Sequence, residues 1–236
     1  MEQSEGIRIN KYLSSMGICS RREADRLIEG GHVTIEGNAA EPGSRLSGNE
    51  VVCIDGKVIG KAKDTKSIKR VVLAVNKPRG YVCTTSDKDR APKITDLIDY
   101  PERVYPIGRL DKDSEGLILM TNDGTLANEI TKASGNHEKE YVVTVDKIVT
   151  DAFVKKMSQG MYLKDIDKSA KPCKVERIDL HTFSIVLTQG LNRQIRRMCE
   201  ELGYKVLTLK RVRIMSVRLG SIKEGKWKKI DPEWLN

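Results

Sequence analysis

The stretch Gly108-Arg109-Leu110-Asp111-Lys112-Asp113-Ser114-Glu115-Gly116-Leu117 carries the most information in this chain of 236 residues. It places a charged loop between two glycines, and the apolar run Leu117-Ile118-Leu119-Met120 follows directly. A run this apolar predicts a buried strand. Because Asp111 lies between Leu110 and that strand, we expect its carboxylate to point into the fold, with Arg109 as a counter-charge. A solvated turn is the alternative interpretation of so charged a loop.

The first sixty residues predict a small module of helices and short strands. Ile9, Leu13 and Met16 have helical spacing. The stretch Ser20-Arg21-Arg22-Glu23 is a capping box that starts a second helix, which ends at Gly30-Gly31. Short strands are then expected at 33–35, 51–54 and 58–59, the last of them after a tight Asp55-Gly56 turn.

This module resembles the alpha-L RNA-binding module named after ribosomal small-subunit protein S-four. The matching pieces are residues 9–13 (INKYL), 20–24 (SRREA) and 31–35 (GHVTI), and the turn 35–37 departs mildly from the usual Val-Asn-Gly. The resemblance implies a face that grips RNA phosphates. A solvated helix surface is the alternative. The basic side chains that we expect on an RNA-binding face are Arg8, Lys11, Arg21, Arg22 and Arg26.

The remainder of the chain predicts a second, larger domain. Residues 61–70 are charged and poor in apolar side chains, so we expect a linker there. Strands and helices then follow without regular alternation, which favours an α+β fold with a mainly antiparallel mixed sheet. The expected domains are therefore 1–60 for the S-four-like module and 71–236 for the second domain. Its expected strands are 71–76, 81–84, 103–106, 117–121, 139–145, 173–178, 182–188, 206–209 and 212–218, and its expected helices are about 125–133, 151–159 and 192–202.

Charge and composition narrow the functional classes. The net charge is +9, and residues 191–229 hold 12 Lys and Arg against 3 Asp and Glu, which suggests a phosphate-rich partner rather than only a basic surface. The five cysteines and three histidines are scattered, and no glycine-rich nucleotide loop is present. We therefore expect no metal and no cofactor, in a reducing cytoplasm. The apolar runs are too short to cross a bilayer, and the polar N-terminus predicts no targeting segment.

Three stretches in this order resemble the pseudouridine synthases, in the bacterial branch of the small-subunit and large-subunit ribosomal RNA enzymes. They are Asn76-Lys77-Pro78-Arg79-Gly80, the loop quoted first, and residues 189–199 (QGLNRQIRRMC). The resemblance extends from residue 7 to about 230, and residues 190–200 and 210–215 are most similar to the large-subunit synthase F subfamily. It implies isomerisation of a uridine to pseudouridine in structured RNA, without redox change or an added group.

The resemblance also implies roles for individual residues. Asp111 would be the essential carboxylate, which either attacks C1′ or removes the 2′ proton to give a glycal, the route that we favour. Tyr141, on a strand with Val143 and Val145, would stack on the target uracil and place its hydroxyl for proton transfer; an ordinary core tyrosine is the alternative. Arg196, at the edge of the apolar stripe of a helix capped by Asn192, would form a salt bridge with Asp111.

Other charged residues are expected to bind RNA or to shape the loop. The resemblance implies that Arg109 fills the space left by the flipped base. Lys77 is expected near the RNA, although a simple Pro-Gly turn is the default explanation of its loop. Arg193 and Arg197 are expected on the outer helix face, free for phosphates unless that face is merely solvated. A glycosidase-like acid/base role for Asp113 and Glu115 is the alternative, but we expect them to be structural.

The expected partner is ribosomal RNA, the large subunit favoured, with transfer RNA open as a second target. We expect a monomer without a membrane association. A non-catalytic RNA-binding factor of ribosome assembly is the main alternative, and it predicts that Asp111 is dispensable. A sugar hydrolase would need a second positioned carboxylate and an aromatic cleft, which two tryptophans near the C-terminus do not supply.

Overall fold

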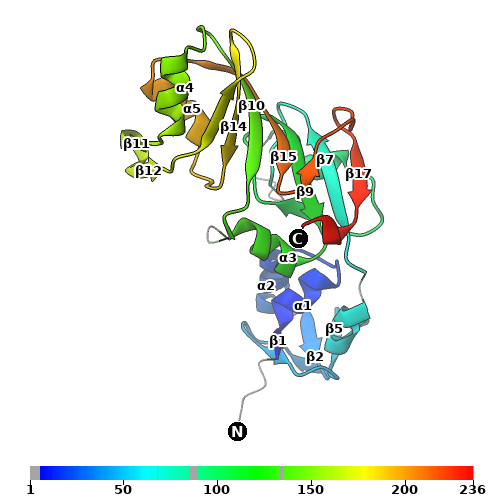
Figure 1. Cartoon of the computed structure of the whole chain (residues 1–236). Coiled ribbons are helices and arrows are strands. Elements are labelled where there is room, and N and C mark those ends of the chain that lie inside the picture. The colour runs from blue at the N-terminus through cyan, green and yellow to red at the C-terminus, as the bar shows by residue number, and fades with distance from the viewer. Residues whose placement is uncertain (1–5, 68, 85–89, 133–134, 236) are drawn as a thin grey trace. The chain divides into compact units, whose positions relative to one another are not determined.

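The computed structural model describes residues 6–67, 69–84, 90–132 and 135–235, which form two compact units (Figure 1). The first unit combines the chain up to Arg70 with Tyr100–Val104 and Asn122–Gly124, and the second contains the rest. Within the described residues, no helix has the length and apolar character that a membrane span requires.

Two short helices and a four-stranded antiparallel sheet make up the first unit, as the sequence predicts. Ser20 accepts a hydrogen bond from the backbone N–H of Glu23 at 3.1 Å and so starts the second helix, and Gly31 (φ +74°) lies just beyond its end. The sheet has the order β3-β2-β5-β6, and β1 pairs separately with β4. The elements are β1 Ile7–Arg8, α1 Ile9–Ser15, α2 Arg21–Glu29, β2 Val33–Ile35, β3 Asn38–Ala39, β4 Arg45–Leu46, β5 Val51–Ile54, β6 Lys57–Lys61 and η1 Ala62–Ser67.

The stretch expected as a linker begins inside this folded unit, which corrects the expected boundary. Lys61 ends β6, and Ala62 is only 5% exposed because it packs in the apolar core of the first unit. The backbone N–H of Lys63 donates to the carbonyl of Gly48 at 2.9 Å. A single small apolar residue among charges was too weak a signal to predict this packing.

The second unit is built on a sheet in the order β13-β14-β10-β15-β9-β7-β17, with β8 added to β9 and β16 to β15. All of its pairings are antiparallel except that of β15 with β9, so the α+β fold with a mainly antiparallel mixed sheet is confirmed. Its elements are β7 Val72–Lys77, η2 Ile94–Leu97, β8 Tyr105–Ile107, β9 Glu115–Thr121, α3 Gly124–Thr131, β10 Lys139–Val145, α4 Asp151–Ser158, β11 Met161–Leu163, η4 Lys164–Ile166, β12 Lys168–Ala170, β13 Lys174–Arg177, β14 Thr182–Leu187, α5 Gln194–Glu201, β15 Val206–Ile214, β16 Val217–Arg218, β17 Trp227–Ile230 and η5 Pro232–Leu235.

Several expected elements differ in detail. Helix α5 begins at Gln194 and not after an Asn192 cap, because Arg193 at the capping position has left-handed backbone (φ +50°). The expected strand at 81–84 is reduced to a bridge between Val82 and Lys93, and residues 85–89 lie outside the described residues. The two strands expected at 206–218 are the single long β15 followed by β16. The β11–β12 hairpin and β17 were not predicted.

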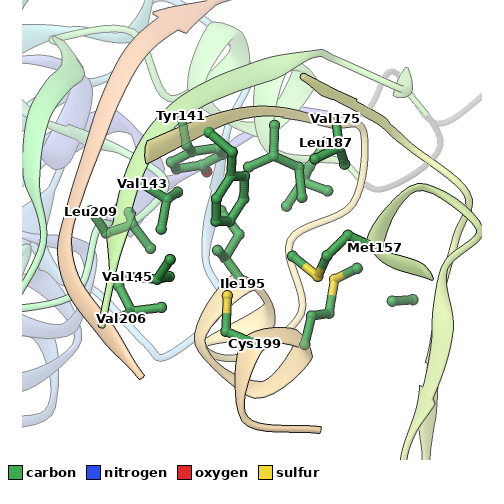
Figure 2. Close-up of a cluster of buried hydrophobic side chains, with 14 of the residues drawn as sticks. Tyr141, Val143, Val145, Met157, Val175, Leu187, Ile195, Cys199, Val206 and Leu209 are labelled. Carbon is green, nitrogen blue, oxygen red and sulfur yellow. The ribbon is translucent and has the colours of Figure 1, made fainter. Parts of the chain in front are cut away.

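Helices α4 and α5 cover the β13–β14–β10 end of the sheet (Figure 1). Tyr141, Val143 and Val145 alternate along β10 and face an apolar cluster that includes Met157 of α4 and Ile195 of α5 (Figure 2). Strict alternation on β10 means that the intervening residues face the other side of the sheet. The side chains of β10 that can reach the charged loop are therefore those on the same face as Tyr141.

Candidate active site

Four neighbouring strands place the key residues in one row. Lys77 at the end of β7 is the register partner of Gly116 on β9, Gly116 is the partner of Arg211 on β15, and Arg211 is the partner of Tyr141 on β10. Directly opposed residues in a sheet project to the same face. The side chains of Lys77, Arg211 and Tyr141 therefore share the face over which residues 108–116, here named the aspartate loop, enter the sheet.

Gly116 makes this row possible. Its φ is +104°, a backbone conformation that residues other than glycine rarely adopt. A Cβ atom added there would lie 2.3 Å from the carbonyl oxygen of Arg211. The close approach of the two backbones brings the aspartate loop against β15, so any larger residue at this position must push the loop out of place.

Lys77 is the centre of the loop's anchoring. Its side chain is 0% exposed, and its Nζ donates to the carbonyl oxygens of Ser114 at 2.6 Å, Asp111 at 3.0 Å, and Lys112 at 3.4 Å, as well as to that of Pro78 at 3.0 Å. Burial lowers the pKa of this ammonium. The structure does not place Lys77 where the expected RNA contact needs it, because the buried ammonium is used by carbonyl oxygens of the protein.

Arg196 holds the same loop but does not form the expected salt bridge. Its Nη2 donates to the carbonyl of Asp113 at 3.1 Å and lies 3.5 Å from the Ser114 hydroxyl. Among the described residues, no ion pair joins its guanidinium to Asp111. Burial is the main cause that lowers the pKa of Arg196, and the charge of Asp111 is one of those that oppose the shift. The direct contacts of Arg196 with the loop therefore go to the backbone carbonyl of Asp113 and the side-chain hydroxyl of Ser114, not to the Asp111 carboxylate.

Arg211 is the functional candidate that sequence reasoning missed. It is 3% exposed, and its Nε donates to the carbonyl of Leu117 at 2.6 Å. Its Nη1 donates to the carbonyl of Arg109 at 3.3 Å, on the other side of the loop. Nothing in the local sequence distinguishes it from the other cations of residues 210–213, because its place depends on the register of three strands.

The three acids of the loop have different surroundings. An Asp113 oxygen lies 3.8 Å from Nη1 of Arg193, and a Glu115 oxygen lies 3.9 Å from Nζ of Lys210. Within the described part of the chain, the half-buried Asp111 carboxylate has no such cation within ion-pair distance. This distribution supports the structural interpretation of Asp113 and Glu115, and it leaves Asp111 as the acid available for chemistry.

Tyr141 is part of the apolar core and is also the register partner of Arg211 in the row of site residues. It is 9% exposed and lies in the apolar cluster on this face of the sheet (Figure 2). The same cluster includes Leu110 of the aspartate loop. A ring in this cluster can stack on a base only through the part of its surface that the other side chains leave exposed. Its stacking on uracil stays a prediction.

The cations expected to bind phosphates are placed differently from one another. Arg109 and Arg193 are exposed, the first in the aspartate loop and the second before α5. Arg197 is not free on an open face, because it forms an ion pair with Asp165 and its Nε donates to the carbonyl of Asn192 at 2.8 Å. In the first unit all five expected cations are exposed, although Arg26 pairs with Glu23; they are Arg8, Lys11, Arg21, Arg22 and Arg26.

An open groove of about 580 Å³ lies elsewhere on the second unit. It contains the ion pairs of Arg213 with Glu138 and Glu140, on the sheet face opposite Tyr141. None of the predicted site residues lines it. Among the described residues, no group of three His, Cys, Asp or Glu side chains is placed to hold a metal ion.

Comparison with known families gives two matches within the chain. The RNA pseudouridylate synthase family matches residues 71–201, and the S4 domain matches residues 7–52. These are the two parts in which the expected catalytic and RNA-binding residues lie.

Individual relatives extend the similarity to the whole chain. Dual-specificity RNA pseudouridine synthase RluF of Escherichia coli is 47% identical over 235 residues, which cover 100% of this chain and 79% of that protein. Ribosomal large subunit pseudouridine synthase B of Pseudomonas aeruginosa is 33% identical and covers 96% of this chain and 60% of its own length. A crystal structure of a pseudouridylate synthase matches with a TM-score of 0.69 and 28% identity, over 98% of each chain.

Proposed function

The chain belongs to the RNA pseudouridylate synthase family, and from this membership we propose that it isomerises a specific uridine of large-subunit ribosomal RNA to pseudouridine. As a member it is an isomerase that acts on RNA. The choice of the large subunit is supported by the similarity to a ribosomal large subunit pseudouridine synthase of Pseudomonas aeruginosa. The name of the Escherichia coli relative includes a dual specificity, which is the reason to test a second RNA class, and transfer RNA is our candidate. Such substrates belong to the cytoplasm, where ribosomes are assembled.

Asp111 is the proposed catalytic residue, and its loop carries the proposal. The observation behind it is that Lys77, Arg196 and Arg211, all buried, donate to backbone carbonyls of residues 109–117 and so fix the loop, while the Asp111 side chain is unpaired among the described residues. A carboxylate held in one position needs little reorganisation to act. Attack on C1′ and removal of the 2′ proton both require this.

Tyr141 and Arg109 are proposed to handle the target base. A uridine stacked in RNA must leave its stack to reach a carboxylate, at a cost of a few kcal/mol. Arg109 is exposed in the aspartate loop two residues before Asp111, where a long side chain can fill the space that the base leaves. Tyr141 belongs to the same apolar cluster as Leu110 of the aspartate loop, which supports a ring that stacks on the flipped uracil.

The first unit is proposed to select the RNA. Its exposed cations on α1 and α2 can grip phosphates without reading bases, a contact that positions RNA. We further propose that Arg193 contacts phosphate near the active site, since it is exposed and, among the described residues, its only ion pair is the long one to Asp113. The protein is proposed to act as a monomer.

Mapping of pseudouridines tests the substrate directly. Ribosomal and transfer RNA would be compared between cells with this protein, cells without it, and cells that carry only the Asp111→Asn variant. We expect one large-subunit site to be lost in both mutant strains. A non-catalytic assembly factor would instead leave the site modified in the Asp111→Asn strain, and an unchanged map in both strains would contradict the ribosomal target.

A further inference from the structure

Two arginines that are two residues apart on β15 have opposite environments. Arg211 is the register partner of Tyr141, and Arg213 is the partner of Glu140, because a β-bulge shifts the pairing between them. Arg213 therefore faces the other side of the sheet, where its Nε lies 2.7 Å from Glu140 and its Nη2 lies 3.0 Å from Glu138. Because of the bulge, Arg213 forms ion pairs on one face of the sheet, whereas Arg211 faces the aspartate loop on the other.

Arg211 is a buried cation without a carboxylate partner. No ion pair involves it among the residues that the structure describes. Its charge also acts on other cations: burial is the main cause that lowers the pKa of Lys77 and of Lys139, and the charge of Arg211 lowers both further. Burying an uncompensated charge is costly. A fold that needed Arg211 only for packing would be better served by an apolar residue.

Its hydrogen bonds point to the same conclusion. Nε and Nη1 reach the carbonyls of Leu117 and Arg109, which lie on either side of Asp111. The third nitrogen, Nη2, is buried and has no hydrogen-bond partner among the described residues. The guanidinium therefore spans the two ends of the aspartate loop and keeps both its charge and one donor unused by the protein.

We propose that Arg211 is a positioning residue for the isomerisation: its guanidinium fastens both ends of the aspartate loop and holds an uncompensated positive charge beneath it, which attracts the Asp111 carboxylate into the reacting position. This inference rests on the proposed role of Asp111. It assigns to Arg211 a part in turnover and no contact with RNA, since its side chain is almost completely covered.

The test separates rate from affinity in the full-length protein. The substrate is total RNA labelled with 5-tritiated uridine, taken from cells that lack the protein, so that whichever uridine is the target is present. Single-turnover tritium release at saturating enzyme gives the rate, and the enzyme titration gives the affinity. Arg211→Met is expected to lower the rate about 100-fold and to change the affinity less than about threefold.

Two further variants make the outcome specific. Arg211→Lys, which keeps the charge but cannot span both carbonyls, is expected to recover about tenfold of the lost rate. Arg213→Met, the matched control on the opposite face, is expected to keep the wild-type rate. Arg211→Met at a rate close to wild type, an affinity loss as large as the rate loss, or Arg211→Lys no faster than Arg211→Met would each overturn the inference.

Asp111→Asn in the same series distinguishes the two proposals. If Asp111→Asn is inactive and Arg211→Met is active, only the role of Arg211 is wrong. If Asp111→Asn is active, the proposed catalytic residue itself is wrong. Should Arg211→Met fail to fold by circular dichroism, the comparison of Arg211→Lys with wild type decides: a reduced rate at unchanged affinity supports the proposal, and equal rates contradict it.

Discussion

The ammonium nitrogen of Lys77 lies 3.0 Å from the carbonyl oxygen of Asp111, although the two residues are 34 positions apart in the sequence. The same nitrogen reaches Lys112 and Ser114, and the backbone N–H of Gly80 donates to the carbonyl of Lys112 at 2.8 Å. The Asn-Lys-Pro-Arg-Gly turn therefore anchors the aspartate loop by hydrogen bonds to its backbone carbonyls. These bonds do not depend on which side chains the loop carries.

Lys77→Met should separate loop anchoring from RNA binding. Removing the ammonium leaves several buried carbonyls without a donor, so the free energy of unfolding is expected to fall by about 2 kcal/mol, and the single-turnover rate by about 100-fold. RNA affinity and its salt dependence should stay as in wild type. Denaturant unfolding and RNA binding at several salt concentrations provide the measurements.

Arg79→Met is the matched control for Lys77, because Arg79 lies in the same turn but is exposed. It is expected to leave stability unchanged. If Lys77→Met instead weakened RNA binding with a flatter salt dependence, while stability and rate were kept, the ammonium would be an RNA contact after all.

Arg196 and Arg193 should behave differently although they are only three positions apart in the sequence. Arg196→Ala is expected to slow turnover steeply at nearly unchanged affinity, because the loop loses its bond to the Asp113 carbonyl. Arg193→Ala is expected to weaken RNA binding and to reduce the log–log salt slope by about one unit or less. Arg197→Ala, whose guanidinium is paired with Asp165, should change the slope less than Arg193→Ala.

Affinity against salt concentration and single-turnover rates for the three variants are the measurements. Equal affinity losses in all three, with unchanged rates, would mean that Arg196 is one more phosphate contact. A larger slope change for Arg197 than for Arg193 would mean that the Asp165 pair opens when RNA binds.

Tyr12→Phe should stabilise the protein slightly, and more so at high pH. The Tyr12 hydroxyl is buried without a hydrogen-bond partner among the described residues, so its removal is expected to be neutral or to stabilise by about 1 kcal/mol at pH 7. Burial, and secondarily the charge of Asp64, raises the pKa of Tyr12 to about 12 from an ordinary 10.0. The wild type therefore loses stability as the pH rises from about 10 through about 12, whereas Phe has no proton to lose.

The measurement is denaturant unfolding of both proteins at pH 7 and at pH 11. The stability difference in favour of the Phe variant should widen at the higher pH. A Phe variant that is clearly less stable at pH 7 would show that the hydroxyl makes a stabilising bond.

Local patterns in the sequence were sufficient to predict most of the helices and strands, and the aspartate loop. The capping Ser20, the alternation of Tyr141, Val143 and Val145, and the apolar run after Gly116 are all written in neighbouring residues, and the structure agrees with each. Their identification required no knowledge of which strands pair.

The wrong expectations depend on contacts between distant strands. Lys77 looked like a surface lysine in a turn, and its burial follows only from the pairing of β7 with β9. The Arg196–Asp111 pair was expected from the family resemblance, but in the structure carbonyl oxygens accept hydrogen bonds from the Arg196 guanidinium. The role of Arg211 could not be predicted, because a β-bulge in the pairing of β10 with β15 decides that it faces the loop while Arg213 does not.

The two-part division of the chain has a direct test as well. The first unit includes Tyr100–Val104 and Asn122–Gly124, so residues well beyond Arg70 in the sequence belong to it. We expect a chain that starts at Val71 to fold and to bind RNA more weakly and less selectively. Circular dichroism and RNA binding check this, and an unfolded 71–236 chain would contradict the division.

The most direct test of the central claim is tritium release by Asp111→Asn from total RNA labelled with 5-tritiated uridine and taken from cells that lack the protein. The substitution keeps the size of the side chain and the backbone contacts of the loop, and it removes only the negative charge. We predict that the variant binds the RNA as tightly as wild type and releases no tritium above background in a single turnover. Release at a rate within about tenfold of wild type, which corresponds to a loss of only about 1.4 kcal/mol of transition-state stabilisation, would contradict the assignment of Asp111 as the catalytic carboxylate.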